Sequence, residues 1–588
     1  MRYVLPVLFL AALGGCVTPR TAVRDSAPVE VQILAINDFH GALEPPRLAV
    51  VAGGEPGSEQ RIPAGGAAHL ATAMARLRAG NANTISVAAG DLTSASPFVS
   101  SQFLDEPSIV ALNMIGLDLN AVGNHEFDRG TSELLRLQNG GCVQHTALPA
   151  CRVDKEFAGA RFRYLSANVN AKSGGTLFPA TALRSFGSGA SKVQVGFIGL
   201  TLRETATLVA PDAVTDVTFA DEAETINALV PRLRAEGADA VVVMIHQGVY
   251  TKVGYNDKSC GGVSGDLLPV LARLDPGIDV VVSGHTHAAY VCDYGKIDAA
   301  RPYLVTSAGS RGMLVTNITL AIDPASRRVM RKSADNVIVA SDPYDGPAGI
   351  VPVDAAFPVY PPDGAVKALV DRYVAAAKPI ADRIAGRLGA PLQRARNTSG
   401  ESQLGSLVAD AQLAATNAEI AFMNAYGLRA DLVPRTDGGV TFGQLYAVQP
   451  FGNVLQVKGL TGVQLRALLE QQFNSGSNTV DRPNMLHASR GFVYSYDLRR
   501  PAGERIIAMT LDGKPIEDGR VYRVGISNFL ATGGDNFSVF ENGTDLTGGG
   551  TDDVASLEAY LKQGGNIAPP PLGRVTRVDA PVTPPPGD

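Results

Sequence analysis

The sequence predicts an α/β protein with at least two domains. At 588 residues the chain is too long for one hydrophobic core. From about residue 29 to residue 339, short β-branched runs alternate with amphipathic segments of helical periodicity. The runs are apolar throughout rather than alternating, which is typical of strands buried on both faces of a sheet.

The first part of the chain contains the clearest elements. We predict helices at residues 67–78, 107–115 and 221–235. The β-branched runs predict strands at residues 31–36, 84–88, 119–122, 193–199, 238–245 and 279–282.

A Pro/Gly/Asp-rich stretch at 341–363 ends this pattern and is predicted to be a linker, followed by a long helix at 365–388. Residues 390–578 then form a second domain, with helices near 404–416 and 461–472. Its strands are expected near 420–423, 491–496 and 520–526. The Pro-rich residues 579–588 indicate a disordered tail.

Composition restricts the functional class. Hydrophobic residues make up 45% and charged residues 18% of the chain, as in folded soluble proteins. The net charge of -6 argues against a protein that coats nucleic acid, which would need a broad basic face. We therefore expect no nucleic-acid partner.

Residues 1–16 are predicted to be a lipoprotein signal peptide. Arg2 precedes an apolar run at 3–13 that is too short to span a bilayer. Leu13-Gly14-Gly15-Cys16 then has the pattern of a lipoprotein processing site, with Cys16 as the acylated residue. An ordinary signal peptide is the alternative. With a tether at 17–28, the protein is expected to be exported and lipid-anchored, in the periplasm or at the outer membrane, and to touch membrane only through this lipid.

The other four cysteines are even in number, which favours two disulfides in an exported chain. Of the three connectivities we prefer nearest neighbours, Cys142–Cys151 and Cys260–Cys292. A cysteine-metal site is the competing interpretation, but no C-x-x-C spacing supports it.

Five of the predicted strands end in side chains that bind metals. Five of the eight histidines of the chain lie at these ends, where chance would scatter them. In strand order the residues are Asp38 and His40, Asp91, Asn124 with His125 and Asp128, His246, and His285 with His287.

This placement has a physical reason. Ligands of α/β proteins bind at the carboxyl ends of the strands, and D-x-H or H-x-H places two side chains on one side of an extended segment. The ligands are oxygen and imidazole without thiolate, which suits Zn, Mn, Fe or Co. Seven ligands suit two ions, with Asp91 able to bridge them, and such a pair can activate water against a phosphate ester.

Together these motifs resemble the calcineurin-like metallophosphoesterases, over residues 29–340. With the second domain, the chain is similar to the 5'-nucleotidases and periplasmic UDP-sugar hydrolases. The resemblance implies a four-layer α/β/β/α N-terminal domain, a long linker helix and a C-terminal α+β substrate-binding domain.

The resemblance also assigns roles. It places Asp38, His40, Asp91 and His287 on one metal, and Asp91, Asn124, His246 and His285 on the other. His125 would stabilise charge on the phosphate in the transition state, held protonated and oriented by Asp128.

Shorter motifs extend the resemblance into the second domain. Residues 400–411, 424–429, 449–453 and 528–535 each match a family pattern. By that analogy Phe451 and Phe529 sandwich a base, Asp535 accepts hydrogen bonds from the ribose or base, and Asn453 joins the substrate site. Arg429 and Arg396 would hold phosphate oxygens, with Arg394 equally near. Ala425 and Tyr426 replace two glycines of the family pattern.

The resemblance implies a hydrolase that removes phosphate from nucleoside 5'-monophosphates or nucleotide sugars, by attack of a metal-bound water or hydroxide. Two alternatives remain: a phosphodiesterase for 2',3'-cyclic nucleotides or another esterase using the same two metals, and a nucleotide-binding surface lipoprotein without catalysis. The sequence leaves the metal and the oligomeric state open.

Overall fold

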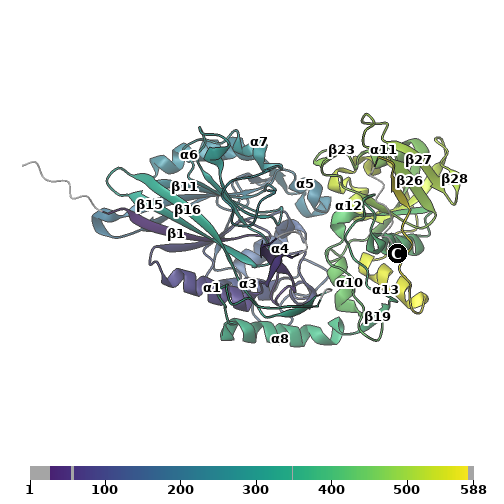
Figure 1. Cartoon of the computed structure of the whole chain (residues 1–588), viewed down its shortest axis with the longest axis horizontal. Coiled ribbons are helices and arrows are strands. Elements are labelled where there is room, and N and C mark those ends of the chain that lie inside the picture. The colour runs from purple at the N-terminus through teal and green to yellow at the C-terminus, as the bar shows by residue number, and fades with distance from the viewer. Residues whose placement is uncertain (1–26, 55–57, 347–348, 580–588) are drawn as a thin grey trace, which may run out of the picture.

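The computed structural model describes residues 27–54, 58–346 and 349–579, so Cys16, the tether up to Ser26 and the tail from Ala580 lie outside the described residues. The chain forms a larger N-terminal domain and a smaller C-terminal domain side by side along the long axis of the molecule (Figure 1). Among the described residues, none of the helices combines the length and apolarity needed to span a bilayer.

Two six-stranded sheets form the middle of the N-terminal domain. One has the order β16-β15-β1-β4-β5-β6 and the other β13-β14-β12-β11-β9-β8. The strands of the first sheet are β1 (Val29–Ile36), β4 (Thr84–Ala88), β5 (Leu119–Ala121), β6 (Arg163–Leu165), β15 (Leu314–Asp323) and β16 (Arg328–Ile338). Those of the second are β8 (Thr181–Phe186), β9 (Val193–Thr201), β11 (Ala240–His246), β12 (Val280–Ser283), β13 (Ala289–Asp293) and β14 (Leu304–Ala308).

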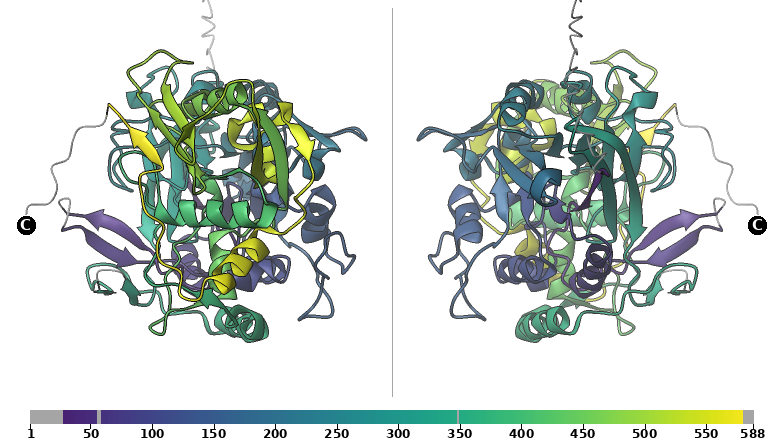
Figure 2. Two further views of the ribbon diagram at one scale, coloured as in Figure 1. Left: turned by 90° about the vertical axis from the view of Figure 1, so that its right-hand side faces the viewer. Right: turned by 90° about the vertical axis from the view of Figure 1, so that its left-hand side faces the viewer.

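Helices cover the outer face of each sheet, so the domain has the expected four layers, α/β/β/α. The two sheets bury one apolar core between them, which includes Val31, Val87 and Val242. On the outside, α1 (Ala67–Ala79) and α3 (Glu106–Ile115) pack on the first sheet, and α6 (Glu222–Ala235) on the second. The hairpin of β2 (Ala49–Gly53) and β3 (Gln60–Pro63) projects from the side of the domain (Figure 2).

The long helix α8 is shorter than the sequence predicts. It covers Gly364–Ala381, capped by Asp363, and residues Ile384–Arg387 form strand β19 instead. The last turn contains Pro379, and the strand that follows packs so closely on helix α13 (Asp553–Gln563) that a Cβ at Gly386 would lie 2.4 Å from Leu561 Cβ. Because Val366, Leu369 and Tyr373 belong to the N-terminal core, α8 packs with that domain, and the connection between the domains lies after its end.

The C-terminal domain is α+β. A five-stranded sheet has the order β25-β20-β29-β22-β30, and a four-stranded sheet the order β28-β27-β26-β31. Their strands include β25 (Leu486–Ala488), β26 (Phe492–Tyr496), β27 (Ile506–Leu511), β28 (Lys514–Pro515), β30 (Thr544–Leu546) and β31 (Val575–Arg577). The elements that carry the substrate motifs are α9 (Gln403–Thr416), β20 (Ile420–Asn424), α10 (Phe442–Val448), β22 (Leu455–Thr461), β29 (Val521–Ser527) and α12 (Asn528–Ala531).

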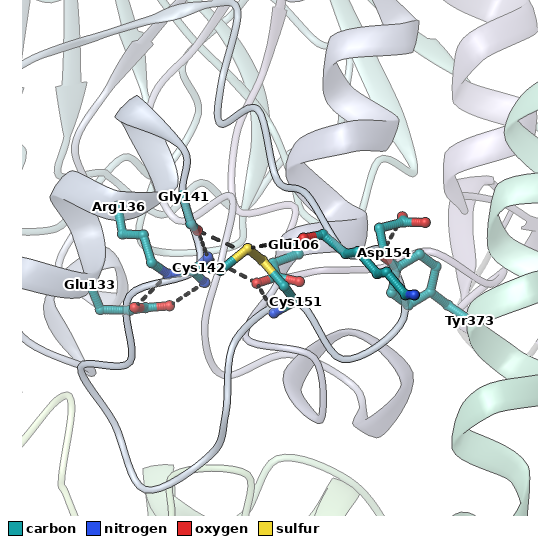
Figure 3. The surroundings of a disulfide bond; sticks show 9 residues. Glu106, Glu133, Arg136, Gly141, Cys142, Cys151, Asp154 and Tyr373 are labelled. Atoms are coloured by element: carbon teal, nitrogen blue, oxygen red, sulfur yellow. Dashed lines mark hydrogen bonds and ion pairs between the residues drawn. A yellow bond between two sulfur atoms is a disulfide. The ribbon is translucent and has the colours of Figure 1, made fainter.

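Two disulfides join Cys142 to Cys151 and Cys260 to Cys292, the pairing preferred from the sequence. Figure 3 shows the first of them, beside the buried ion pair of Arg136 with Glu106 at 2.9 Å. A few residues further on, Asp154 accepts a hydrogen bond from the Tyr373 hydroxyl of α8 at 2.9 Å. The disulfide loop therefore holds α8 against the N-terminal domain.

Candidate functional site

The predicted ligand side chains meet at one edge of the N-terminal domain. Strands β1, β4 and β5 are neighbours in the first sheet, and β11 and β12 are parallel neighbours in the second. Their carboxyl ends open on the same crevice between the sheets, so residues more than 200 positions apart come into contact there.

Asp38, His40 and His287 form the first group. One ligand atom from each lies within 4.8 Å of the others. The Nε2 atom of His287 is 3.1 Å from His40 Nε2 and 3.3 Å from Asp38 Oδ1. The first two side chains are completely buried.

Asp91, His246 and His285 form the second group, again within 4.8 Å of one another. Asn124 belongs with them, because its Oδ1 atom lies 3.1 Å from both His246 Nε2 and His285 Nδ1. Asp91 stands between the groups: its Oδ2 atom is 3.0 Å from His246 Nε2 and 3.7 Å from His40 Nε2.

This donor set fits a pair of divalent cations. Burial lowers the pKa values of His285, to about 3, and of His40 and His287, so these rings are neutral at physiological pH and keep a lone pair for a cation. Burial also lowers the pKa of His246, but the adjacent Asp91 carboxylate outweighs it and raises that pKa to about 10. A cation between this carboxylate and ring would take the place of the proton.

The backbone at the site adopts an uncommon conformation. Five of the seven predicted ligands have φ between 44° and 69°, in the left-handed region. Asp and His enter that region more readily than most residues, yet each such residue costs free energy relative to extended or right-handed backbone. The five are Asp38, His40, Asp91, His285 and His287.

Two glycines of the motifs leave room for the ligands. A Cβ at position 123 would lie 2.2 Å from Asp91 Oδ1, and one at position 284 would lie 2.9 Å from Asp38 Oδ2. A side chain at Gly123 or Gly284 would therefore displace a carboxylate of the site.

His125 and Asp128 lie beside the two groups. His125 Nδ1 is 2.8 Å from Asp128 Oδ2, and the His125 ring is 5.2 Å from that of His40. The backbone N–H of His125 donates to Asp91 Oδ1 at 2.9 Å. Burial lowers the pKa of His125, but the carboxylates of Asp128 and Asp91 outweigh it and raise that pKa overall. This favours an imidazolium that can donate to an anion.

The sequence motifs assign no role to Glu126, although it lies within the G-N-H-E-F-D motif. Its buried carboxylate accepts hydrogen bonds from the backbone N–H groups of Asp91 at 2.9 Å, Leu92 at 2.7 Å and Gly123 at 2.7 Å. It therefore ties the turn after β4 to the turn after β5 and positions the ligands that both turns carry. The signal that could have found it is a further carboxyl group inside the motif that carries Asn124, His125 and Asp128.

Asn37 is a second such residue. Its amide donates to Asp38 Oδ2 at 2.6 Å and to the Gly309 carbonyl at 2.7 Å. Its own oxygen accepts from the backbone N–H of Ala308 at 2.7 Å. Asn37 thus fixes the Asp38 carboxylate against the strand end of the opposite sheet.

The C-terminal domain reaches this crevice with Phe451 and Arg429. The Phe451 ring stacks on the His125 ring, with centroids 5.8 Å apart and planes at 20°. The Arg429 guanidinium lies over the Phe451 ring, 5.8 Å from its centroid. It is close enough to the first group to lower the pKa values of His40 and His287 in addition to the effect of burial.

Asp535 and Phe529 belong to one segment of the chain, Phe529 in helix α12 and Asp535 in the short 3-10 helix at Gly534–Asn536 that follows it. Asp535 is buried with φ of 56°, accepts a hydrogen bond from Asn424 at 2.6 Å, and interacts electrostatically with Arg429. The Phe529 ring lies against Gly534, where an added Cβ would be 2.6 Å from the ring.

Two predicted binding residues do not join this group. Arg396 donates to the Pro483 carbonyl at 3.3 Å and lies near His487, and its role in holding phosphate stays a prediction. Arg394, two residues earlier, is the one whose charge acts on Arg429 and on Arg311. In an extended segment residues two apart share a side, so the different surroundings of Arg394 and Arg396 reflect irregular backbone at residues 393–397 rather than strand alternation.

Asn453 also points elsewhere: its amide donates to Asp553 Oδ2 of α13 at 3.2 Å. Its place in the structure is at the base of the Phe451 loop. There its carbonyl also accepts the backbone N–H of Asp553 at 2.9 Å. Asn453 therefore supports this loop through Asp553, and its role as a direct binding residue stays a prediction.

The domains also contact each other on both sides of the crevice. On one side Phe98 packs on Phe442 and Tyr446, with centroids 5.7 and 5.3 Å apart. On the other side Arg482 pairs with Asp266 at 3.2 Å and lies 4.9 Å from the centroid of the Tyr250 ring. Tyr426, which replaces a glycine of the family pattern, is 51% exposed and interacts electrostatically with this second contact.

Two family models match the chain. Residues 31–289 match the calcineurin-like phosphoesterase, and residues 379–542 match the C-terminal domain of 5'-nucleotidase. These matches coincide with the two domains described above.

Relatives cover most of the chain. It is 30% identical to the cell wall protein Lmo0130 of Listeria monocytogenes, over 90% of this chain and 67% of that protein. It is 28% identical to the endonuclease YhcR of Bacillus subtilis, over 89% of this chain but only 39% of that longer protein. A solved structure, the 5'-nucleotidase precursor from Thermus thermophilus, superposes with a TM-score of 0.71 at 26% identity, covering 94% of this chain and all 100% of that one.

Proposed function

The chain belongs to the 5'-nucleotidase family of metal-dependent phosphoester hydrolases, and we propose that it releases phosphate from nucleoside 5'-monophosphates or nucleotide sugars. The observation that carries the proposal is the contact between the domains. The Phe451 ring of one domain stacks on His125, the histidine beside the metal-type groups of the other domain, and the Arg429 guanidinium lies over the Phe451 ring. A substrate with both a flat base and a phosphate matches that combination.

Two divalent cations would be held by the two groups of ligands. Asp38, His40 and His287 would hold one, Asn124, His246 and His285 the other, and Asp91 both. When bound, such a pair neutralises phosphate charge and lowers the pKa of water. Glu126 and Asn37 keep the ligands in place.

The other residues act on the substrate. The imidazolium of His125, oriented by Asp128, donates a hydrogen bond to a phosphate oxygen as charge increases there. Arg429 and Arg394 hold further phosphate oxygens, because a guanidinium presents paired donors to them. Phe451 and Phe529 would stack on the base, and Asp535 would accept hydrogen bonds from the base or ribose.

Hydrolysis of a substrate panel tests the proposal. The nucleotide products are separated by chromatography and inorganic phosphate is measured as well, because 2',3'-cyclic AMP and UDP-glucose give monoesters before any inorganic phosphate is released. Protein stripped of metal and reloaded with Mn or Zn is offered AMP, UMP, UDP-glucose, 2',3'-cyclic AMP and p-nitrophenyl phosphate. We expect AMP, UMP or the nucleotide sugar to give the highest kcat/KM. Preference for the cyclic substrate would instead assign a phosphodiesterase. No turnover of any compound, with metal bound, would assign a binding protein.

We also propose that the protein is exported and held to the cell envelope by a lipid on Cys16. The two disulfides support export, since such bonds persist in oxidising compartments. Cys16→Ala in the full-length chain should abolish metabolic labelling with palmitate and release the protein from the membrane fraction. Unchanged labelling would contradict the proposal.

A further inference from the structure

A cavity of about 810 Å³ lies at the end of the N-terminal domain remote from the metal-type groups. Asp239 and Asp279, which line it, directly precede strands β11 and β12, whereas the ligands follow the other ends of those strands. Seven residues of β11 separate the two ends by roughly 20 Å. The cavity is therefore independent of the crevice where hydrolysis is proposed.

The lining of this cavity is positively charged. Four cations, Arg234, Arg327, Arg328 and Lys332, face two carboxylates. We call these four residues with the space between them the basic end pocket.

Both carboxylates are already engaged by the fold. Asp239 accepts the backbone N–H of Gln194 at 2.7 Å and pairs with Arg327 at 2.6 Å. Asp279 accepts the backbone N–H of Val241 at 2.9 Å and pairs with Arg234 at 3.3 Å. These contacts use Arg234 and Arg327 as structural partners.

Arg328 and Lys332 are the two cations of the pocket that do not pair with these carboxylates. In the described part of the chain, neither side chain makes a hydrogen bond or an ion pair, although Lys332 interacts electrostatically with Asp279 and Asp293. Lys332 is half-buried in the pocket wall and Arg328 is exposed at its mouth. Two cations without bound partners at one cavity are suited to an anion.

An apolar side chain is exposed beside them. The pairing of β15 with β16 shifts between Ala321 and Ile322, which leaves Met330 without a partner in a β-bulge. Met330 is 64% exposed there, among the highest values of the large apolar residues of the described chain. A cationic pocket with an exposed apolar side chain is the combination found on surfaces that bind lipid headgroups.

The described chain also begins at this end of the molecule (Figure 1). Val29, the first residue of β1, pairs with Ile322 next to the β15–β16 turn, and Glu30 pairs with Arg331 at 2.8 Å. Only residues 17–28 separate Cys16 from β1, and twelve residues reach at most about 40 Å. A lipid on Cys16 would hold this end, rather than the crevice, near the bilayer.

We propose that the basic end pocket binds the phosphate headgroups of an anionic phospholipid surface, so that the N-terminal domain lies on the membrane with its crevice turned away from it. This inference uses the proposed lipid anchor for orientation only and does not depend on the proposed hydrolysis. The cation pair supplies the attraction and Met330 the apolar contact.

Hydrogen exchange of the full lipidated chain in vesicles tests this proposal. Vesicles of phosphatidylcholine alone are compared with vesicles containing phosphatidylglycerol, and exchange is followed in peptides covering residues 322–332. Each cation near an anionic surface strengthens binding roughly fivefold, so we expect exchange to slow by about that factor or more with phosphatidylglycerol. Equal exchange in both vesicles would overturn the proposal.

Two variants and one competitor sharpen the result. Arg328→Gln combined with Lys332→Gln should remove the protection, whereas Arg500→Gln combined with Lys514→Gln, which removes two cations of the C-terminal domain, should keep it. Both should unfold at the wild-type urea midpoint, which shows that they are folded whether or not the protein hydrolyses the substrates tested. Protection produced by inorganic phosphate in neutral vesicles would assign the pocket to a soluble anion and contradict the lipid. Protection that persists in the variant with Arg328→Gln and Lys332→Gln would show that the basic end pocket does not bind the lipid surface.

Discussion

The two sides of the crevice are built differently. On the N-terminal side the ligands are rigid strand ends, and Asp38, His40, Asp91, Asn124 and His246 are at most 2% exposed. On the C-terminal side Arg429 and Phe451 are partly exposed and come from loops between elements. Geometry is therefore fixed within one domain for the metals, but it depends on the placement of two domains for the substrate. Variants on the two sides should consequently affect different kinetic constants.

The largest effect should come from Asp91→Asn. Asp91 stands between the two groups, so its loss weakens both cation sites, and we expect kcat to fall at least about a thousandfold with less metal bound. Phosphate release and metal content by mass spectrometry measure this. Asp118→Asn, at the amino end of β5, is the control and should keep the wild-type kcat and metal content. An Asp91→Asn protein with two bound metals would show that the carboxylate is not a ligand.

His125→Ala should reduce kcat by roughly a hundredfold while the metal content stays at the wild-type value, because His125 lies beside the groups rather than within them. Asp128→Asn should have a smaller effect of the same kind and should shift the alkaline limb of the kcat profile to lower pH. The direction follows from the carboxylate, which raises the pKa of His125: without it the imidazolium is lost at lower pH. An unchanged pH profile would disprove the positioning role of Asp128.

Arg394→Ala should lower kcat/KM roughly tenfold or more, because it removes a cation that acts on Arg429 and the phosphate position. Arg396→Ala is the matched control two residues away and should change kcat/KM less than about twofold, since it contacts the Pro483 carbonyl instead. The reverse order of the two effects would support the assignment made from the sequence.

Phe451→Ala should raise KM about five- to a hundredfold for nucleotides, the range expected for one lost stacking contact. Hydrolysis of p-nitrophenyl phosphate, which has no base, should change less. If KM for both substrates rises equally, the ring serves the contact with His125 rather than the base.

The smallest effect on catalysis is expected at Asp553, where a substitution should change the free energy of unfolding instead. Burial next to Asp552 raises the pKa of Asp553 to about 8, above the value of about 3.9 in an unfolded chain. The protonated form is therefore favoured by folding, and this contribution, complete below pH 4, is lost as the pH rises towards 8. Asp553→Asn should remove this loss and raise the free energy of unfolding at pH 8.5 relative to pH 5 by up to about 4 kcal/mol, the value that follows from about three pH units of proton binding. Urea denaturation of the mutant and the wild type at pH 5 and pH 8.5 measures this free energy. If the two proteins differ by the same amount at both pH values, the raised pKa of Asp553 is contradicted.

The sequence predicted the buried parallel strands closely because their apolar runs are continuous and end in glycine or polar motifs. Residues 84–88 form a strand as expected, and the helix expected at 67–78 extends by one residue. The hairpin of β15 and β16 was missed, since β16 is largely exposed and its charged residues hide the alternation. The end of α8 was placed too late because the switch to a strand depends on packing against α13.

The same distinction applies to the site. Ligands that follow a strand could be found from local patterns, and the structure brings all seven together. The different surroundings of Arg394 and Arg396 depend on irregular backbone at residues 393–397, which no local sequence pattern predicts. The role of Glu126 required knowing that two turns, 35 residues apart, share one carboxylate.

Five of the predicted ligands have left-handed backbone conformations, which restricts the substitutions that the site can tolerate during evolution. At Asp38 or His287 a substitution must satisfy two independent conditions at once, a donor atom for a cation and tolerance of positive φ. Glycine meets only the second condition and glutamate only the first, so few amino acids remain acceptable. Chance replacement at these positions should therefore silence the enzyme rather than retune it, and new substrate preferences would have to arise through the loops of the other domain.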